Sequence, residues 1–340
     1  MENETKHEGR KILPFTMKNG YQLATTAPPN IPALVSGLLI QVGTSILSAD
    51  PKSGKSTLAR QLMVDVAEYR EFLEMPTLGG DCLYLYLEGP LGAMQQHFQK
   101  LGHTGQRGQI HVIDESMAAH AEFSLRRLSD SIKNLPNLRL IVVDPLSKLL
   151  CLSDSTSTDE VTPAMALLEK FAKEHSLHVM ALMHEKKRKS EQDTFHNQLG
   201  SVGFRGGSDT NISLTKQGKQ RIISSEQRWG VGLEPRVLNF DEIRLVNSLG
   251  KTVEAVEEEE RGGKARKTLQ RIEKQILDAV LGKPLATNEI LDAVTGKSET
   301  ILDVLERLVS NGRVVGEQDG KTKRYRAVEI QNEEGVKEAA

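Results

Sequence analysis

The segment from Ala49 to Thr57 reads Ala-Asp-Pro-Lys-Ser-Gly-Lys-Ser-Thr and lies between an apolar run and a stretch of helical periodicity. This is the context of a Walker A phosphate-binding loop. Unpaired amides at a positive helix end suit an anion, so the backbone of 52–56 is expected to hold the β-phosphate. We expect Lys55 to reach the β- and γ-phosphates, Ser56 to place its hydroxyl on Mg²⁺, and Thr57 to approach the α-phosphate. The predicted phosphate-binding residues are Ala49, Asp50, Pro51, Lys52, Ser53, Gly54, Lys55, Ser56 and Thr57.

Ala49 departs from the usual loop, which has glycine at this position. Alanine is strained there if the backbone needs a positive φ, and harmless otherwise. The alternative for the whole segment is a chance loop followed by a helix cap.

Two carboxylates follow apolar runs that read as strands. Asp144 comes directly after Leu138–Val143 and fits a Walker B position, where an acid beside the loop holds the water shell of Mg²⁺. Glu88 stands before Gly-Pro at the end of another run, facing the ligand crevice of an open α/β sheet, where it is predicted to act as general base on the attacking water. The alternatives are a helix-cap or turn aspartate and a turn glutamate.

His184 follows the apolar run His178–Met183 at the same crevice edge. We expect it to donate a hydrogen bond to the γ-phosphate and to report hydrolysis to the next loop. A purely structural histidine is the alternative.

Short runs rich in Val, Ile, Leu and Tyr alternate with longer helical stretches, which predicts an α/β fold with a mostly parallel sheet. Their near-continuous apolar character suits strands buried on both faces. Helical periodicity in Ser56–Leu73 and Thr162–Glu174 predicts crossover helices. The predicted strands are Thr44–Ser48, Cys82–Leu87, Ile110–Ile113, Leu138–Val143, His178–Met183 and Ile212–Leu214.

Beyond an acidic run and Gly262-Gly263, the sequence predicts three helices and a hairpin. The helices start at Lys267 and then cover Ala286–Val294 and Ser298–Asn311, and Asp319-Gly320 is a strong hairpin turn signal between Val314–Glu317 and Lys323–Val328. We predict a small C-terminal winged-helix domain. The predicted organisation is an N-terminal extension at 1–30, an ATPase-type α/β domain at 31–250, a charged linker at 251–266, the winged helix at 267–330 and a disordered tail at 331–340.

Net charge is near zero, so a uniformly basic coat is excluded. The only cysteines, Cys82 and Cys151, lack metal-ligand spacing and indicate a reducing compartment. No apolar stretch is long enough for a bilayer span and the N-terminus lacks a signal peptide, so we expect a cytoplasmic protein without membrane contact.

With these residues placed, 31–240 resembles the RecA-like hexameric helicases of plasmid RepA type and, more distantly, the DnaB-type replicative helicases. The resemblance is carried by Ile31–Leu39 ahead of the loop, by Glu88, Asp144 and His184, and by the glycine-rich segment Gly200–Gly207. Recombinases and KaiC-like proteins share these elements. The resemblance implies a RecA-like fold and a homo-oligomeric ring, with a hexamer expected, that holds ATP and Mg²⁺ between neighbouring subunits.

The family also implies an arginine donated in trans to the γ-phosphate. Arg228, in Glu226–Gly230, resembles the finger of the DnaB-type enzymes, although Glu226 stands where those often have lysine. Arg205 in the glycine-rich segment is the competing candidate. Either guanidinium would spread over the oxygens of the transferring phosphoryl group, and a surface arginine is the alternative for each.

Two basic groups are predicted to contact DNA. Lys186, Lys187, Arg188 and Lys189 would track a single strand's phosphates in the ring channel. Lys321, Lys323 and Arg324 on the wing would contact duplex phosphates, with Ser298–Asn311 as recognition helix. Because that helix also carries Glu299, Asp303 and Glu306, a winged helix used for protein contacts is the alternative.

The leading hypothesis is an ATP-driven DNA helicase or translocase of a plasmid, phage or other mobile element. One alternative is a DNA-binding regulator or loader that ATP only switches. The other is a RecA- or KaiC-like ATPase acting on filaments or proteins.

Overall fold

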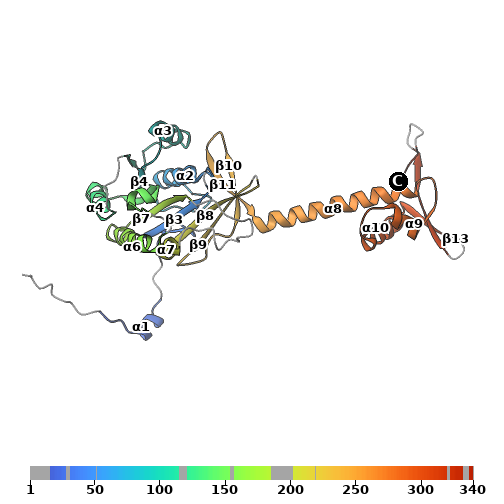
Figure 1. The fold of residues 1–340 in the computed structure, drawn as a ribbon, viewed down its shortest axis with the longest axis horizontal. Helices are drawn as coiled ribbons and strands as arrows, with labels where there is room; N and C mark the ends of the chain where they lie inside the picture. Colours follow the sequence, from blue (N-terminus) through green and yellow to red (C-terminus); the bar gives the residue numbers. More distant parts are fainter. Residues whose placement is uncertain are drawn as a thin grey trace, which may run out of the picture. The chain divides into compact units, whose positions relative to one another are not determined.

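A computed structural model describes residues 16–27, 31–50, 52–114, 121–153, 157–184, 202–218, 220–319, 322–331 and 337–339. The chain divides into two compact units, Met1–Gly250 and Lys251–Ala340 (Figure 1), and each is described by itself.

The first unit is built on a nine-stranded sheet. In order across the sheet, its strands are β11 (Val246–Thr252), β10 (Arg236–Asp241), β9 (Gln220–Gln227), β8 (Thr210–Gln217), β3 (Gly43–Ala49), β7 (His178–His184), β6 (Leu138–Asp144), β4 (Asp81–Tyr86) and β5 (Ile110–Ile113). The strands from β8 to β5 run parallel, whereas β9 returns antiparallel to β8 and β10 antiparallel to β9. The predicted α/β fold with a mostly parallel sheet is confirmed, and each predicted strand is present.

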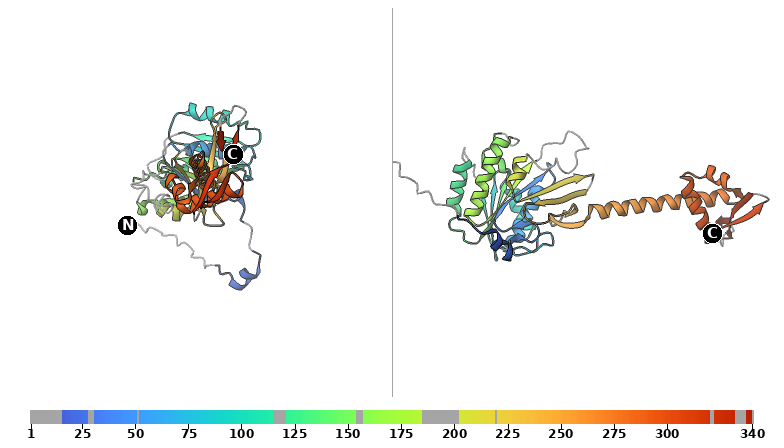
Figure 2. Two further views of the ribbon diagram at one scale, coloured as in Figure 1. Left: turned by 90° about the vertical axis from the view of Figure 1, so that its right-hand side faces the viewer. Right: turned by 90° about the horizontal axis from the view of Figure 1, so that it is seen from below.

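Helices cover both faces of this sheet (Figures 1 and 2). The helices α2 (Lys55–Ala67) and α3 (Leu91–Lys100) contribute buried side chains to one apolar cluster. The helices α4 (Ala121–Ile132), α5 (Leu146–Leu150) and α6 (Thr158–Glu174) contribute to a second cluster on the other face, and α7 (Val202–Gly207) packs against α6. Three further elements precede β3: α1 (Gly20–Thr25), β1 (Ala33–Val35) and β2 (Leu39–Ile40).

Strand β6 shows why the sheet is buried on both faces. Its side chains alternate, so Leu140 and Val142 join the cluster under α2 while Ile141 and Val143 join the cluster under α4 to α6. Both faces therefore need apolar residues, and the strand reads as a continuous apolar run.

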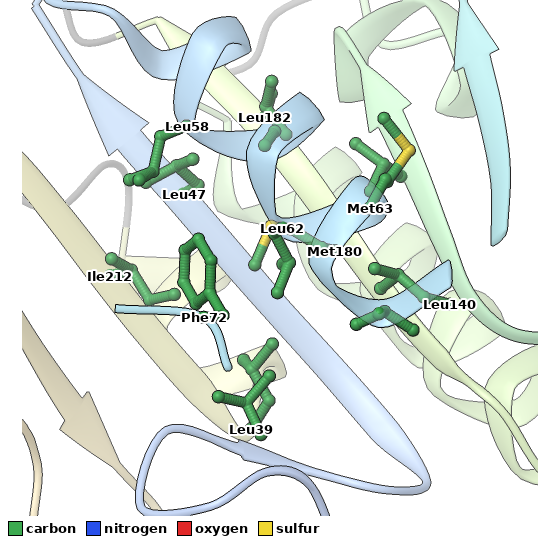
Figure 3. Packing of buried hydrophobic residues seen from close by; sticks show 14 of the residues in the cluster. Leu39, Leu47, Leu58, Leu62, Met63, Phe72, Leu140, Met180, Leu182 and Ile212 are labelled. Atoms are coloured by element: carbon green, nitrogen blue, oxygen red, sulfur yellow. The ribbon is translucent and has the colours of Figure 1, made fainter. Parts of the chain in front are cut away.

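Helix α2 is seated on the sheet by its own apolar stripe (Figure 3). Leu58, Leu62 and Met63 pack over side chains of the central strands, among them Leu47 and Leu182. Full burial of each such side chain contributes about 1.5–3 kcal/mol. The position of the α2 N-terminus relative to β3 is therefore fixed by packing.

Helix α2 ends at Ala67, and the prediction that it continues to Leu73 was wrong. The chain leaves the helix at Tyr69, whose φ of 56° is left-handed. Phe72 and Leu73 stay buried in the same core although they lie in a turn. Their apolar character prolonged the helical pattern in the sequence beyond the helix itself.

The second unit contains three helices and a small antiparallel sheet, in the order along the chain that the sequence predicted. Its three-stranded sheet has the order β12-β14-β13, and its core gathers apolar residues from the three helices and from the sheet. The elements are α8 (Val253–Val280), β12 (Leu285–Ala286), α9 (Thr287–Ala293), α10 (Ser298–Ser310), β13 (Val314–Asp319) and β14 (Thr322–Ala327). Beyond them, β15 (Glu329–Gln331) pairs antiparallel with β16 (Lys337–Ala339), and β16 lies within 331–340, for which the sequence predicted a disordered tail.

Helix α8 begins at Val253, whereas the sequence predicted a helix only from Lys267. The predicted charged linker is thus helical. The Thr252 side chain caps the helix by accepting a hydrogen bond from the Ala255 amide (3.2 Å), and Arg261 pairs with Glu257 one turn away. The helix also contains Gly262 and Gly263, which lower its stability, and capping and pairing of this kind offset part of that loss. No helix in the described ranges combines the length and apolar character needed to cross a membrane.

Glu68 anchors the loop that follows α3. Its carboxylate accepts hydrogen bonds from the amides of Thr104 (2.5 Å) and Gly105 (3.1 Å), from the Thr104 hydroxyl, and pairs with His103 Nδ1 (2.9 Å). Burial alone would raise the pKa of Glu68, but these hydrogen bonds outweigh it and lower the pKa to about 2.

The substitution Glu68→Gln is expected to destabilise the protein at neutral pH by about 2 kcal/mol, because hydrogen bonds to a charged acceptor are lost. The folded-state pKa lies below the ordinary value of 4.5, so this stabilisation is complete above about pH 4.5 and disappears as the pH falls towards 2. Urea unfolding of both proteins at a series of pH values measures it. A difference that stays constant between pH 7 and pH 3 would contradict the assignment.

Candidate nucleotide-binding site

The connection between β3 and α2 forms a cradle of backbone amides. Strand β3 ends at Ala49 and α2 begins at Lys55, with Gly54 as N-cap at φ 95° and ψ 17°. Lys52 is also left-handed at φ 63°, and Ser53 donates from its amide (3.2 Å) and hydroxyl (2.7 Å) to the Asp50 carbonyl. The first amides of a helix have no partner within it, so they and the helix dipole favour an anion here. Within this loop, Pro51 lies outside the described residues.

Ala49 is the last residue of β3 and is fully buried. Its partners across the ladder are His184 on β7 and Leu214 on β8. It is not among the described residues with positive φ. The loop therefore needs no glycine at this position, and the alanine is not strained.

Asp144 lies where β6 ends, buried and 2.7 Å from the Ser56 hydroxyl, which donates to its Oδ2. The Tyr84 hydroxyl donates to the same oxygen at 2.9 Å. Ser56 is the second residue of α2, so this contact joins the helix to the neighbouring strand. A hydroxyl and a carboxylate at hydrogen-bond distance, next to an anion cradle, form a donor set that suits Mg²⁺ bound to phosphate.

Tyr84 fixes the orientation of the carboxylate. Burial and the charge of Asp144 raise the pKa of Tyr84, so its hydroxyl stays protonated and donates. The guanidinium of Arg60 lies 5.8 Å from the centre of the Tyr84 ring. Nothing in the sequence marked Tyr84, because its role depends on the pairing of β4 with β6.

Glu88 and His184 reach the same edge of the sheet. Tyr86, at the end of β4, is paired with Asp144, and Glu88 follows two residues later with its side chain exposed. His184 ends β7 beside Ala49, although its side chain lies outside the described residues. An exposed carboxylate at this edge is accessible to a water molecule.

A cavity of about 550 Å³ lies beside the phosphate loop. The guanidinium of Arg221 lies against Gly54, so close that a side chain there would meet its Nη1 at 2.7 Å, and it stacks 4.5 Å from the centre of the Phe240 ring. The walls come from the loop, from the β8–β9 turn and from β10; they are Lys52, Ser53, Gly54, Thr57, Lys216, Gln220, Arg221, Val237, Leu238, Asn239, Phe240 and Glu242. The sequence analysis missed Arg221 and Phe240, which lie far from any motif in the chain.

Arg228 lies just beyond the other end of β9 and is held in place. Its guanidinium contacts the Asp209 carboxylate (3.7 Å) and donates to the Gly206 carbonyl, and its amide donates to the Asp209 carbonyl (2.8 Å). The Asp209 carboxylate also accepts from the Thr44 amide (3.0 Å) and the Trp229 indole (3.3 Å). Asp209 therefore orients Arg228 while leaving its side chain partly exposed.

Several predicted residues are not brought to this site. The side chain of Arg205 lies outside the described residues, as do Lys186, Lys187, Arg188, Lys189 and Lys321. Lys323 and Arg324 lie on β14 in the second unit, where Lys323 stacks on Tyr325 (5.3 Å) and Arg324 pairs with Glu289 and Asp319.

Comparison with known proteins shows a family and a likeness to solved structures. A family model described as AAA domain matches 17–190, just over half of the chain. A solved KaiC-like protein from the hyperthermophilic archaeon Pyrococcus horikoshii OT3 is 14% identical, with a TM-score of 0.48, covering 64% of this chain and 94% of that one. No curated protein matches the sequence.

The substitution Asp144→Asn is expected to raise the Mg²⁺ concentration needed for nucleotide binding by about 10- to 100-fold, because altering a group that supports a metal usually lowers the metal affinity by this factor. The matched control Tyr84→Phe keeps the carboxylate and removes only its donor, so a smaller loss is expected. Titration of Mg²⁺ against a fluorescent ATP analogue measures both. If Asp144→Asn binds nucleotide with unchanged Mg²⁺ dependence, Asp144 has no part in the metal site.

Proposed function

Because this chain belongs to the AAA domain family of P-loop ATPases, we propose that it is an ATP-driven motor on DNA, a helicase or translocase that works as a ring, with a hexamer as the expected assembly. The observation that carries the proposal is the position of Arg228, at the edge of the sheet opposite the phosphate loop of its own chain.

The register of the strands places these two features apart. Ala49, which leads into the loop, is paired with Leu214 on β8, whereas Ser45 is paired with Thr210, and Thr210 with Gln227 on β9. Arg228 and the phosphate loop thus lie at the levels of Ser45 and Ala49 on β3, each displaced further towards its own edge of the sheet. At about 3.3 Å per residue, the two are roughly 15 Å or more apart along the strand direction. Arg228 therefore cannot reach the phosphates of its own chain.

An arginine that is held in one orientation, is partly exposed and lies far from its own phosphate loop can donate its guanidinium to the site of a neighbouring subunit. Subunits joined head to tail bring this edge of one copy to the loop of the next, and such an interface closes into a ring when the rotation allows it. A guanidinium placed on the γ-phosphate stabilises the charge that develops during phosphoryl transfer. Asp209, which holds Arg228, then acts as its positioning residue.

The remaining chemistry is assigned to the loop of the same chain. Lys55 and the amides before it bind the phosphates of ATP, Ser56 and Asp144 hold Mg²⁺, and Glu88 activates water. The cavity that Arg221 and Phe240 help to line is assigned to the base and ribose, because an aromatic ring and a guanidinium plane both stack on a nucleobase.

The assignment to DNA is supported by the basic run Lys186–Lys189, which in the sequence follows β7 after Glu185. Strand β7 is paired with β3, so His184 at its end lies beside Ala49, where the phosphate loop begins. Consecutive cations suit a nucleic-acid backbone regardless of sequence, with an affinity that falls steeply with salt.

The winged helix receives less support as a second DNA contact. In its described part, Arg324 pairs with Glu289 and Asp319, and Arg326 with Glu317. Glu299, Asp303 and Glu306 are exposed on α10. Acids along this helix repel phosphates, so we assign DNA tracking to the first unit.

The proposed function is tested by ATP turnover with and without single-stranded DNA. Turnover of the wild type is expected to rise with DNA and to fall again with increasing salt, whereas Lys55→Ala is expected to stay near background. A strand-displacement assay accompanies it. An ATP-switched regulator would hydrolyse ATP slowly and unwind nothing, and turnover indifferent to DNA would favour an ATPase that acts on proteins.

The trans position of Arg228 is tested by mixing inactive variants. Arg228→Ala keeps its loop and Lys55→Ala keeps its arginine, so each alone is expected to lose about 10³-fold or more in rate. In a 1:1 mixture that exchanges subunits, about one quarter of the interfaces combine an intact loop with an intact arginine and should recover turnover.

Arg221→Ala is the matched control, because Arg221 lies at the other end of β9, beside its own loop. We expect a raised KM for ATP, which mixing with Lys55→Ala does not repair. If mixing Arg228→Ala with Lys55→Ala restores nothing although the subunits exchange, Arg228 does not act in trans.

A further inference from the structure

Arg60 lies on α2, one helical turn after Ser56, and its guanidinium is close to two tyrosine rings. It lies 5.8 Å from the centre of the Tyr84 ring and 5.5 Å from the centre of the Tyr86 ring. The two tyrosines alternate with Leu85 along β4, so they share the face of the sheet that α2 covers. A cation within about 6 Å of a ring centre is attracted to the ring, so one arginine holds both tyrosines.

The surroundings of Arg60 do not neutralise its charge. Among the residues that the structure describes, none of the ion pairs includes Arg60, and its Nε is buried without a hydrogen-bond partner. A partly buried cation without a carboxylate partner costs desolvation free energy. This cost favours a role of Arg60 at the nucleotide site over a purely stabilising one.

His97, on α3, holds the far side of the guanidinium. The Nη1 of Arg60 lies 3.4 Å from the Nδ1 of His97. A guanidinium carries only donors, so this Nδ1 accepts and the imidazole is neutral. Burial and, after it, the charge of Arg60 lower the pKa of His97 to about 4, which keeps the ring neutral at neutral pH. His97 therefore orients Arg60 without cancelling its charge.

Tyr84 connects Arg60 to the carboxylate assigned to Mg²⁺. Its hydroxyl donates to Asp144 Oδ2 (2.9 Å), the oxygen that also accepts from the Ser56 hydroxyl (2.7 Å). Because a guanidinium cannot accept a hydrogen bond, Arg60 leaves the Tyr84 hydrogen to Asp144. Arg60 thus fixes the ring that orients the carboxylate.

Tyr86 connects Arg60 to the turn that carries Glu88. The Tyr86 hydroxyl donates to the Pro90 carbonyl (3.5 Å), and a side chain at Gly89 would meet its oxygen at 2.3 Å. Gly89 also has a φ of 112°, which favours glycine. The Tyr86 ring and the turn are therefore in direct contact, and the position of the ring limits where the backbone of Glu88 can lie.

We propose that Arg60 is a positioning residue of the nucleotide site. Through Tyr84 it orients the carboxylate of Asp144, and through Tyr86 it holds the turn of Glu88. Because Arg60 belongs to the helix that begins at the phosphate loop, both acids are fixed relative to that helix. The inference rests on the roles proposed for Asp144 and Glu88 in ATP hydrolysis, and it needs neither DNA nor a second subunit.

Arg60→Met tests the proposal, because methionine keeps an unbranched chain but removes the charge. The Mg²⁺ concentration needed for binding of a fluorescent ATP analogue is expected to rise about 10-fold, which reports on Asp144. At saturating Mg²⁺, kcat is expected to fall about 10-fold, which reports on Glu88, while KM for ATP stays nearly constant. Arg60→Lys keeps the charge but not the planar fork, so it should recover part of both losses. An unchanged Mg²⁺ requirement together with an unchanged kcat in Arg60→Met overturns the proposal.

Arg70→Met is the matched control. Arg70 follows α2, and its guanidinium donates to the carbonyls of Leu101 (3.1 Å) and Gly102 (2.9 Å). Its loss should lower the free energy of unfolding and leave the Mg²⁺ requirement and kcat of the folded protein unchanged. Urea unfolding gives the stability of each variant. If Arg60→Met loses only stability, as Arg70→Met does, Arg60 is a structural residue and the proposal fails.

A double-mutant cycle with Tyr84→Phe shows whether Arg60 acts through the Tyr84 hydroxyl. In Tyr84→Phe the carboxylate has already lost its donor, so adding Arg60→Met should raise the Mg²⁺ requirement little further. Fully additive effects would contradict the path through Tyr84. If Arg60→Met does not fold, Arg60→Lys is used in the same cycle, with a smaller rise expected.

The wild type and Lys55→Ala separate this inference from the proposed function. A wild type that turns over ATP no faster than Lys55→Ala would contradict the ATPase chemistry on which both depend. A wild type that is active, with Arg60→Met equal to it in Mg²⁺ requirement and kcat, would contradict only the role of Arg60.

Discussion

The common carboxyl edge of β3, β4, β6 and β7 is the constraint on which the rest of the first unit depends. Parallel strands that lie side by side end at one edge, so residues far apart in the chain meet there. The hydrogen bond from Ser56 to Asp144 shows the result directly, because it joins the start of α2 to the end of β6. This contact holds only if α2 is seated correctly, and the packing of Leu58 and Leu62 on the sheet provides that. The geometry of the site therefore depends on the packing of the core beneath α2.

The change of direction at β9 has an equally strong effect. A strand parallel to its neighbours would start at the edge of the sheet away from the phosphate loop and end at the edge beside it. Because β9 is antiparallel to β8, it starts beside the loop with Arg221 and ends at the opposite edge beside Arg228. The start of β9 thus places Arg221 beside the phosphate loop of its own chain, whereas Arg228, just beyond its end, lies partly exposed at the opposite edge of the sheet. The acid at Asp209 keeps the second guanidinium oriented, so a neighbour would meet a group that needs little reorganisation.

Charge pairing changes how the second unit is understood. Its wing carries arginines that a sequence pattern connects with DNA, yet Arg324 and Arg326 each contact acids on the same unit. Exposed pairs of this kind contribute little to stability. They do reduce the positive field that a nucleic acid would meet. In the first unit, by contrast, Arg221 lies over the Phe240 ring and lines a cavity beside the phosphate loop.

The sequence by itself determined the α/β class, the strands of the parallel sheet, the helices and hairpin of the second unit, and the place of the segment 49–57 between a strand and a helix, because these depend on apolar periodicity and on a contiguous motif. The sequence could not show that α2 ends at Ala67, because Phe72 and Leu73 are as apolar in the turn as they would be in a helix. It also could not show that α8 begins at Val253, because glycines weaken the helical pattern. The harmlessness of Ala49 followed only from its backbone, which is that of a strand. The roles of Tyr84, Arg221 and Phe240 were decided by tertiary structure alone, because strand order and register, which no local pattern encodes, bring their neighbours together.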